Sequence, residues 1–164
     1  MIRLFIADVS GLDIDACLAS VSPQRREKTL RLKNDDDKRR SLGVELLLEK
    51  AAGRSDYALT ENGKPFFPDG GAYFSLSHCG KYAVCAVSGV PGGADSELAR
   101  DNALRLAERF FMPDEAALVE RSLTPEAEFC RLWTLKESYG KLTGRGVAVL
   151  DTATLTFDGG VHIL

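Results

Sequence analysis

Along the first half of the chain, hydrophobic and polar positions follow two periods, one typical of strands and one typical of helices. Residues 2–7 form a short apolar run that predicts a strand, and residues 73–77 and 81–88 predict two more. Ser22-Pro23 predicts a helix start, because serine caps helices and proline suits their first turn. The acidic run 35–37 predicts the start of a longer helix. The core-facing stripe predicted for that helix is Leu42, Leu46, Leu47 and Ala51.

The second half shows helical periods first and strand-like alternation last. Helices are predicted over residues 97–111 and 114–121, and a third begins at Thr124-Pro125. Alternation over residues 147–155 and 161–164 predicts two strands around a Gly-Gly turn. The positions predicted to face the core in the first and third of these helices are Leu104, Ala107, Phe111, Phe129, Leu132 and Trp133. This order of elements predicts an α+β fold and not the regular alternation of a doubly wound sheet.

Composition narrows the class of protein. The chain has 164 residues, of which 45% are hydrophobic, enough for one domain or two small halves that share a core. A formal net charge of −3 argues against a dedicated nucleic-acid-binding protein, which usually has a strongly basic domain. The sequence shows no signal peptide and no apolar stretch as long as a membrane span. The cysteines lack C-x-x-C spacing, so reduced thiols in a cytoplasmic protein are expected.

Acidic and basic side chains in two segments suggest a site for a divalent metal and a phosphate ester. Glu137 lies four residues after Trp133 and four before Lys141, so the three share one helical face. Asp95 and Glu97 lie two residues apart, which places both carboxylates on one side of an extended segment. Mg²⁺ prefers such oxygen ligands, together with phosphate groups and water.

Each of these features also has a plainer interpretation. Asp95 and Glu97 suit a helix start, where carboxylates are favoured. Glu137 and Lys141 at this spacing commonly form an ion pair on a solvated face. His78, in a strand-to-turn setting, is by residue type more often a turn or core residue than a ligand. The functional interpretation is preferred because these residues occur together and in a definite order along the chain.

Six short motifs, in one order, resemble those of a known family. They read S-P-Q-R-R-E-K at 22–28, R-S-L at 40–42, G-K-P at 63–65, F-S-L-S-H-C at 74–79, G-A-D-S-E at 93–97 and W-T-L-K-E-S-Y-G-K at 133–141. The chain thereby resembles 4′-phosphopantetheinyl transferases of the surfactin-synthetase-activating (Sfp) type. Two departures stand out: Ala94 and Ser96 occupy positions beside the aspartate where the family usually has bulky aliphatic residues.

The resemblance implies a reaction and a fold. The enzyme would transfer the phosphopantetheine group of coenzyme A to a serine of an acyl or peptidyl carrier protein, with Mg²⁺ as cofactor, and release adenosine 3′,5′-bisphosphate. The fold would be a pseudo-dimer of two similar α+β halves. The expected halves are residues 1–92, which bind coenzyme A, and residues 93–164, which carry the metal and catalytic motifs. The second half is expected to be shortened relative to the family.

The resemblance also assigns roles to individual residues. The metal ligands would be Asp95, Glu97 and Glu137, and the catalytic residues would be Glu137, Lys141 and Lys136. The residues expected to bind coenzyme A are Arg25, Lys28, Arg40, Ser41, Lys64, Pro65, Ser77 and His78. An alternative is a non-catalytic module that binds coenzyme A or a carrier protein, with a second half too short to complete the site.

A surface for the carrier protein is expected just before Pro113. Phe110, Phe111 and Met112 are adjacent, and three successive large side chains cannot all face one helical core. At least one is therefore expected to be exposed or to lie in a cleft. The plainer interpretation is that two of them complete the core and the third is incidental.

Overall fold

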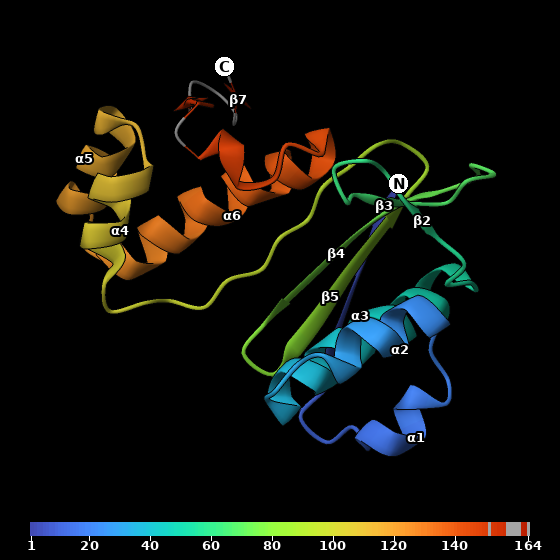
Figure 1. Cartoon of the computed structure of the whole chain (residues 1–164). Helices are drawn as coiled ribbons and strands as arrows, with labels where there is room; N and C mark the ends of the chain where they lie inside the picture. The colour runs from blue at the N-terminus through green and yellow to red at the C-terminus, as the bar shows by residue number, and fades with distance from the viewer. Residues whose placement is uncertain (151, 157–161, 164) are drawn as a thin grey trace.

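The computed structural model describes residues 1–150, 152–156 and 162–163, and it shows an α+β protein with two parts (Figure 1). The first part contains an antiparallel sheet with helices against one face, and the second consists mainly of three helices. Residues 89–102 connect the two parts without helix or strand. The predicted α+β class is confirmed.

The sheet of the first part has the strand order β1–β5–β4, and both pairings are antiparallel. Its strands are β1 (Ile2–Asp8), β4 (Tyr73–Cys79) and β5 (Tyr82–Ser88), so the three predicted strands are confirmed. Gly80 has a φ of 52° in the tight turn between β4 and β5, a conformation that glycine adopts without steric cost. On β4, an edge strand of this sheet, the hydroxyl of Ser77 bonds to Asp95 and to the N–H of Ser96 in the connecting segment.

The first part contains three helices, and capping residues mark several of their ends. They are α1 (Ile14–Leu18), α2 (Pro23–Leu30) and α3 (Asp35–Ala52). Ser22 caps α2 through its side-chain oxygen, as predicted, and three aspartates occupy the first turn of α3. Gly53, with a φ of 74°, ends α3 in the left-handed conformation typical of a helix C-cap.

Helix α3 packs on the sheet and forms the first hydrophobic core. Three of the four predicted core positions of α3 are buried; Leu46 is only half-buried, while Leu48 is fully buried. The buried members of this core are Val9, Val44, Leu47, Leu48, Ala51, Phe67, Phe74, Ala83, Cys85 and Val87. At about 25 cal/mol per Å² of buried apolar surface, such a cluster is the main stabilising contribution to this part.

A small hairpin lies beside the sheet. It consists of β2 (Ala58–Leu59) and β3 (Pro65–Phe66), which pair antiparallel. The predicted Asn-Gly turn joins them, with Gly63 at a φ of 79°. This turn places Lys64 at the boundary between the two parts of the molecule.

The helix predicted over residues 97–111 is wrong in its first third. Helix α4 begins only at Ala103 and ends at Phe110. Just before the predicted start, the chain is held on β4: Ala94 N donates to Ser75 Oγ, and Ser96 N donates to Ser77 Oγ. The N–H groups of Ala94 and Ser96 are thus satisfied by strand side chains.

The second part packs three helices around its own core. Helices α5 (Pro113–Arg121) and α6 (Pro125–Thr143) follow α4; the predicted start at Pro125 is confirmed, and α5 begins one residue before its predicted start. Thr124 precedes α6 but makes no side-chain capping bond. The buried members of this core are Ala103, Ala107, Phe111, Val119, Phe129, Leu132 and Leu155. Of the predicted core positions, Leu104 is 44% exposed and Trp133 half-buried. Within the described ranges no helix has both the length and the apolar character that crossing a membrane requires.

The strand predicted over residues 147–155 is also wrong. The structure has a short 3₁₀ helix, η1 (Gly146–Val149), and strand only at β6 (Leu155–Thr156). The reason is a buried ammonium: Lys136 Nζ donates to the carbonyls of Leu150 and Ala153, which folds this segment back on α6. Strand β7 (His162–Ile163) pairs with β6, and the predicted turn at 158–160 lies outside the described residues.

Candidate active site

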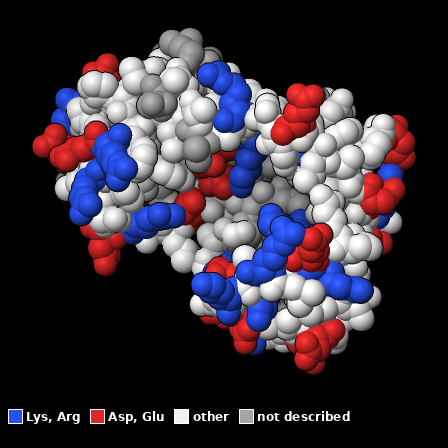
Figure 2. Space-filling model, in the orientation of Figure 1, with Lys and Arg blue, Asp and Glu red and all other residues white. Residues whose placement is uncertain are grey.

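Two adjoining cavities lie where β4, the β2–β3 turn, α2 and the end of α6 meet. We call them the His78 cavity, of about 230 Å³, and the Lys64 cavity, of about 260 Å³. Their linings share Gly63, Pro65 and Leu76. Figure 2 shows a hollow between the two parts, with Lys and Arg side chains around it and acidic side chains beside it.

The His78 cavity is lined by basic side chains among apolar ones, whereas the Lys64 cavity extends to the last turn of α6. Besides the shared residues, the His78 cavity is lined by Gln24, Arg25, Lys28, Val44, Tyr57, Leu59, Ser77 and His78. The Lys64 cavity is lined by Asn62, Lys64, Phe74, Ser75, Gly140, Lys141, Gly144 and Gly146. Seven residues of the predicted site line these two cavities: Arg25, Lys28, Lys64, Pro65, Ser77, His78 and Lys141.

Asp95 joins the connecting segment to both parts of the molecule. Its Oδ1 accepts hydrogen bonds from Ser77 Oγ at 2.8 Å and from Lys141 Nζ at 2.7 Å. Its side chain is only 6% exposed, so the ion pair with Lys141 is largely withdrawn from water. The other oxygen, Oδ2, is buried and finds no hydrogen-bond partner in the described part of the chain.

Glu137 lies one helical turn before Lys141 on α6 and carries a second buried oxygen of this kind. Its Oε1 has no hydrogen-bond partner among the residues that the structure describes. Burial raises the pKa of Glu137, the negative charge of Asp95 raises it further, and Lys141 acts in the opposite direction. Two neighbouring carboxylates that each leave a buried oxygen without a partner offer the kind of oxygen ligand that a hard cation takes.

Glu97, the third predicted ligand, faces a different partner. Its carboxylate accepts a bond from Arg100 at 2.7 Å. Across residues 1–150, 152–156 and 162–163, no three Asp, Glu, His or Cys side chains gather closely enough to hold a metal. The structure thus brings Asp95 and Glu137 together with Lys141 and leaves Glu97 beside them, paired with Arg100.

Backbone contact between Gly93 and α6 sets how closely Asp95 approaches the helix. A Cβ added at Gly93 would lie 1.8 Å from the carbonyl oxygen of Ser138 and 2.7 Å from Leu142 N. Only glycine therefore fits between the connecting segment and the helix backbone. The glycine of the G-A-D-S-E motif therefore has a steric function in this structure.

Replacing Gly93 by alanine is expected to push this segment off α6 and destabilise the protein by about 1–3 kcal/mol, as overpacking does. Transfer activity should fall as Asp95 moves away from Glu137. Urea unfolding and a steady-state assay measure the two effects. Gly92→Ala is the matched control, since a Cβ there meets no atom within 4 Å. Equal behaviour of the two variants would show that close approach at Gly93 is unimportant.

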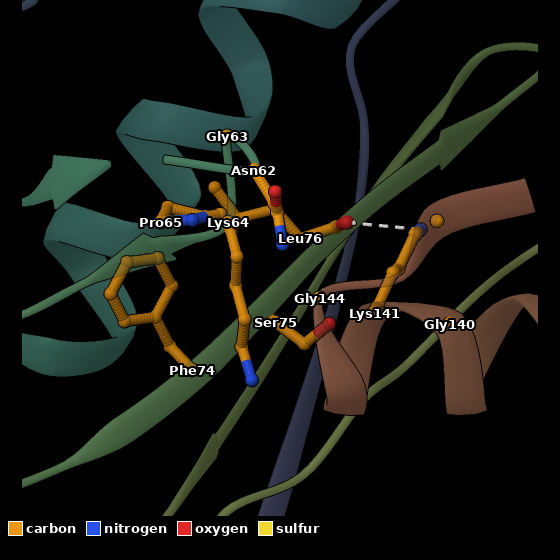
Figure 3. A pocket seen from close by; sticks show the side chains of 11 residues that line it. Asn62, Gly63, Lys64, Pro65, Phe74, Ser75, Leu76, Gly140, Lys141 and Gly144 are labelled. Atoms are coloured by element: carbon orange, nitrogen blue, oxygen red, sulfur yellow. Dashed lines mark hydrogen bonds between the residues drawn. The ribbon is translucent and has the colours of Figure 1, made fainter. Parts of the chain in front are cut away.

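Two lysines cross between the parts in opposite directions. Lys64, in the turn of the small hairpin, donates to the carbonyl of Leu142 near the end of α6. Lys141, on α6, donates to the carbonyl of Leu76 on β4 at 3.1 Å, the bond drawn in Figure 3. The carbonyls at a helix C-terminus carry partial negative charge, which favours the lysine contact with Leu142. The two bonds therefore connect the first part to α6 beside the Lys64 cavity, which both lysines line.

The His78 cavity concentrates positive charge. Partial burial lowers the pKa of His78, and the charges of Arg40, Lys141 and Lys28 lower it further. Burial and the charge of Arg25 also lower the pKa of Lys28. A bound anion would offset the repulsion between these positive charges and stabilise the protonated forms of His78 and Lys28. The electrostatics of the cavity therefore favour a negatively charged group such as a phosphate.

Comparison with known proteins places this geometry in a family. The profile described as the 4′-phosphopantetheinyl transferase superfamily matches residues 92–160. A 4′-phosphopantetheinyl transferase of Bacillus subtilis is 30% identical over 167 residues, which cover 94% of this chain and 75% of the relative. The chain belongs to the 4′-phosphopantetheinyl transferases. The Sfp transferase of Bacillus subtilis strain 168 is 32% identical, over 89% of this chain and 71% of the relative. The transferase psf-1 of Bacillus pumilus is 37% identical, over 85% of this chain and 66% of the relative.

This transferase therefore carries phosphopantetheine from coenzyme A to carrier proteins, and the predicted family and enzyme class are confirmed. The match of the family profile begins at residue 92, just before the motif that contains Asp95. It also includes α6 with Glu137 and Lys141. The three residues that the structure gathers thus all lie in the matched segment.

Two of the residues predicted to bind coenzyme A, Arg40 and Ser41, line neither cavity. Arg40 is engaged by the carbonyl of Gly80 at 2.6 Å and by Asp37, although its charge still reaches His78. Ser41 is buried, and its hydroxyl bonds to that of Thr29 at 2.8 Å, between α3 and α2. Its position favours helix packing over direct contact with coenzyme A.

Lys136 corrects the sequence interpretation most clearly. Its side chain is 0% exposed and its ammonium lies 2.6 Å from the carboxylate of Glu115, which is itself buried. Its remaining donors bond to two carbonyls of the segment after α6, and the ring of Phe111 lies beside it. An ammonium satisfied in this way suits a structural role within the second part and not the predicted catalytic one.

The predicted carrier-protein surface at residues 110–112 is mostly part of the core. Phe111 is buried and stacks on Phe129 with ring centroids 5.2 Å apart. Phe110 packs edge-on against Trp133 and is half-buried, as is Met112, the residue that precedes α5. Phe111 therefore belongs to the core, as the plainer interpretation expected for two of the three residues. Phe110 and Met112 keep partial access to solvent.

Proposed function

We propose that the transfer proceeds to a serine hydroxyl of an acyl or peptidyl carrier protein, with Mg²⁺ bound beside Lys141 and with adenosine 3′,5′-bisphosphate as the second product. The observation that carries this proposal is the pair of buried, unpartnered oxygens, Asp95 Oδ2 and Glu137 Oε1, next to a basic cavity. Burying a carboxylate oxygen without a hydrogen-bond partner costs free energy of folding, unless a bound ligand supplies the missing contact.

The basic His78 cavity would hold the nucleotide end of coenzyme A. Arg25, Lys28 and His78 line one space and come from α2 and β4. Charge-assisted hydrogen bonds to phosphate are among the stronger polar contacts, and they would account for recognition of the 3′-phosphate. Pro65, which lines both cavities, and Lys64, which lines the second, would contact the adenine side of the nucleotide.

Asp95 and Glu137, with Glu97 turning from Arg100, would hold the metal ion. Their donor set fits Mg²⁺, which prefers carboxylate oxygens completed by substrate phosphates and water. When bound, the ion would supply neutralisation of the charge that builds on the diphosphate oxygens during transfer.

The residues of the chain itself divide the chemistry between α6 and β4. Glu137, whose pKa burial raises, is suited to accept the proton of the attacking serine hydroxyl. Lys141, whose ammonium already bonds to Asp95 and to a β4 carbonyl, is placed to stabilise the departing phosphate. Ser77 holds Asp95 in position through its hydroxyl.

We also propose that the chain consists of two related halves, residues 1–92 and 93–164, in a cytoplasmic enzyme. In the first half, β1 is followed by three helices and the small hairpin β2–β3. In the second, the extended segment around Asp95 is followed by three helices and the small hairpin β6–β7. This repeated order supports a pseudo-dimer in which the cavities lie between the halves.

The reaction can be tested by incubating the full chain with coenzyme A, Mg²⁺ and a panel of apo-carrier proteins. Mass spectrometry should show that the carrier serine gains one phosphopantetheine group and that adenosine 3′,5′-bisphosphate accumulates. Omission of Mg²⁺ should stop the reaction. If no carrier protein of the panel is modified although coenzyme A binds, the proposal is contradicted and a non-catalytic binding role is favoured.

Removal of the 3′-phosphate should weaken binding of the nucleotide. Dephospho-coenzyme A is expected to bind about ten times more weakly than coenzyme A, since one or two charge-assisted bonds are lost. Isothermal titration calorimetry with each compound measures the difference. In a His78→Ala variant the difference should shrink, because one of the phosphate contacts is already gone. Equal affinities in the unmodified protein would remove the proposed role of this cavity.

A further inference from the structure

We propose that Glu45 and Tyr57 are positioning residues for coenzyme A: they hold the guanidinium of Arg25 so that its outer amino group meets a phosphate in the His78 cavity. This inference rests on the proposed role of Arg25 in binding coenzyme A. Glu45 belongs to none of the six motifs, and Tyr57 lies between two of them.

Glu45 is a carboxylate in the interior of α3, in the middle of an apolar run. It is 1% exposed, yet both of its oxygens are bonded. Oε1 accepts a bond from the backbone N–H of Ser22 at 2.6 Å, and Oε2 accepts one from Arg25 Nε at 3.1 Å. One buried side chain of α3 therefore fixes both the start of α2 and the arginine on its first turns.

Tyr57 completes a closed ring of contacts around the arginine. Arg25 Nη2 donates to the hydroxyl of Tyr57 at 2.9 Å, and that hydroxyl donates to Glu45 Oε2 at 3.1 Å. The ring of Tyr57 is itself fixed, since it packs edge-on against Phe74 with centroids 5.9 Å apart. Three side chains from α2, α3 and the loop after α3 thus restrain one another.

The bonds to Glu45 and Tyr57 use one edge of the guanidinium and leave the Nη1 amino group. For Nη1 no hydrogen-bond partner occurs within the residues described, and Arg25 lines the His78 cavity together with Lys28. An arginine side chain that is free to rotate loses substantial entropy when it binds a phosphate. Here the fold has already restrained the side chain, which reduces that cost when the ligand binds.

Glu45 also balances charge. Arg25, Lys28 and His78 crowd one cavity, and the charge of Arg25 already opposes protonation of Lys28. A buried carboxylate behind the arginine stabilises its charge without occupying the side that faces the cavity. A purely structural role, in which Glu45 only anchors the start of α2, makes a different prediction: its loss would lower stability and leave the KM for coenzyme A unchanged.

The experiment compares Tyr57→Phe and Glu45→Gln with the unmodified enzyme in steady-state transfer to one apo-carrier protein. Tyr57→Phe keeps the ring and removes only the hydroxyl, so it remains informative if Glu45→Gln does not fold. Each variant is expected to raise the KM for coenzyme A about three- to tenfold, with kcat within about twofold, as the loss of one supporting hydrogen bond implies. Tyr73→Phe, at an exposed position of β4, is the matched control and should change neither quantity.

A double-mutant cycle distinguishes positioning from general stability. In an Arg25→Gln background, Tyr57→Phe should have almost no further effect on the KM, because both residues act through the guanidinium. Effects that multiply in the double variant, or a fall in kcat at constant KM, would overturn the inference alone. A KM that Arg25→Gln itself leaves unchanged would instead show that the proposed contact of Arg25 with coenzyme A is wrong.

Discussion

Replacing Asp95 by asparagine is expected to lower kcat/KM for transfer at least about 100-fold, a loss typical of removing a central electrostatic group from an active site. Asparagine keeps the shape of the side chain and an oxygen that Ser77 and Lys141 can still bond. It removes the negative charge that offsets Lys141 and that would hold a cation. The assay uses saturating coenzyme A and a range of Mg²⁺ concentrations, and raised Mg²⁺ should restore little of the activity.

The asparagine variant is preferred to alanine because Asp95 is buried. An alanine would leave the Lys141 ammonium without the partner that lies 2.7 Å away, and a loss of stability could then be mistaken for a loss of chemistry. Asp101→Asn, at an exposed position in the same half, is the matched control and should retain full activity. If Asp95→Asn kept more than about a tenth of the activity, the electrostatic role assigned to this carboxylate would be untenable.

Replacing Lys136 by methionine is expected to lower the free energy of unfolding by about 3–5 kcal/mol, the usual cost of removing one member of a buried ion pair. Glu115 would stay buried without its counter-charge, and the carbonyls of Leu150 and Ala153 would lose their shared donor. Urea unfolding followed by circular dichroism measures the change. Lys33→Met, at an exposed position, should change stability by less than about 0.5 kcal/mol.

A second substitution separates charge from packing at this pair. Glu115 also accepts bonds from the backbone N–H groups of Met112 and Leu155. Adding Glu115→Gln to Lys136→Met removes the uncompensated charge and keeps an acceptor for one of these N–H groups. The double variant should therefore recover about 1–2 kcal/mol relative to Lys136→Met. A double variant no more stable than the single one would show that the lysine contributes through packing alone.

The sequence predicted the elements whose ends depend on neighbouring residues. Ser22-Pro23 and the acidic first turn of α3 act locally, and the structure confirms both helix starts. The two wrong elements depend on partners far away in sequence. Just before residues 97–102, which are not helical, the chain bonds to the serine hydroxyls of β4, and where a strand was predicted Lys136 draws the carbonyls of Leu150 and Ala153 inward. Local periodicity contains no information about such contacts.

The candidate site shows the same division. The spacing of Glu137 and Lys141, together with the motif around Asp95, predicted the three residues that the structure gathers. Lys136 is adjacent to Glu137 in the same motif, but successive residues of a helix lie about 100° apart around its axis, and Lys136 points toward Glu115. Glu45 was missed, although a carboxylate inside the apolar run of α3 is itself a signal. Its partner Tyr57 could not be predicted, because only the folded chain places the two side chains together.

The two crossing lysines have a consequence for which positions tolerate change. In each of these two crossing bonds the lysine donates to a main-chain carbonyl, that of Leu142 for Lys64 and that of Leu76 for Lys141. A main-chain acceptor is present whatever residue occupies the position. In a saturation library, losses through these two bonds should therefore appear at the lysines and not at the residues that receive them. Pairwise covariation between 64 and 142, or between 141 and 76, should accordingly be weak even though each pair is in contact.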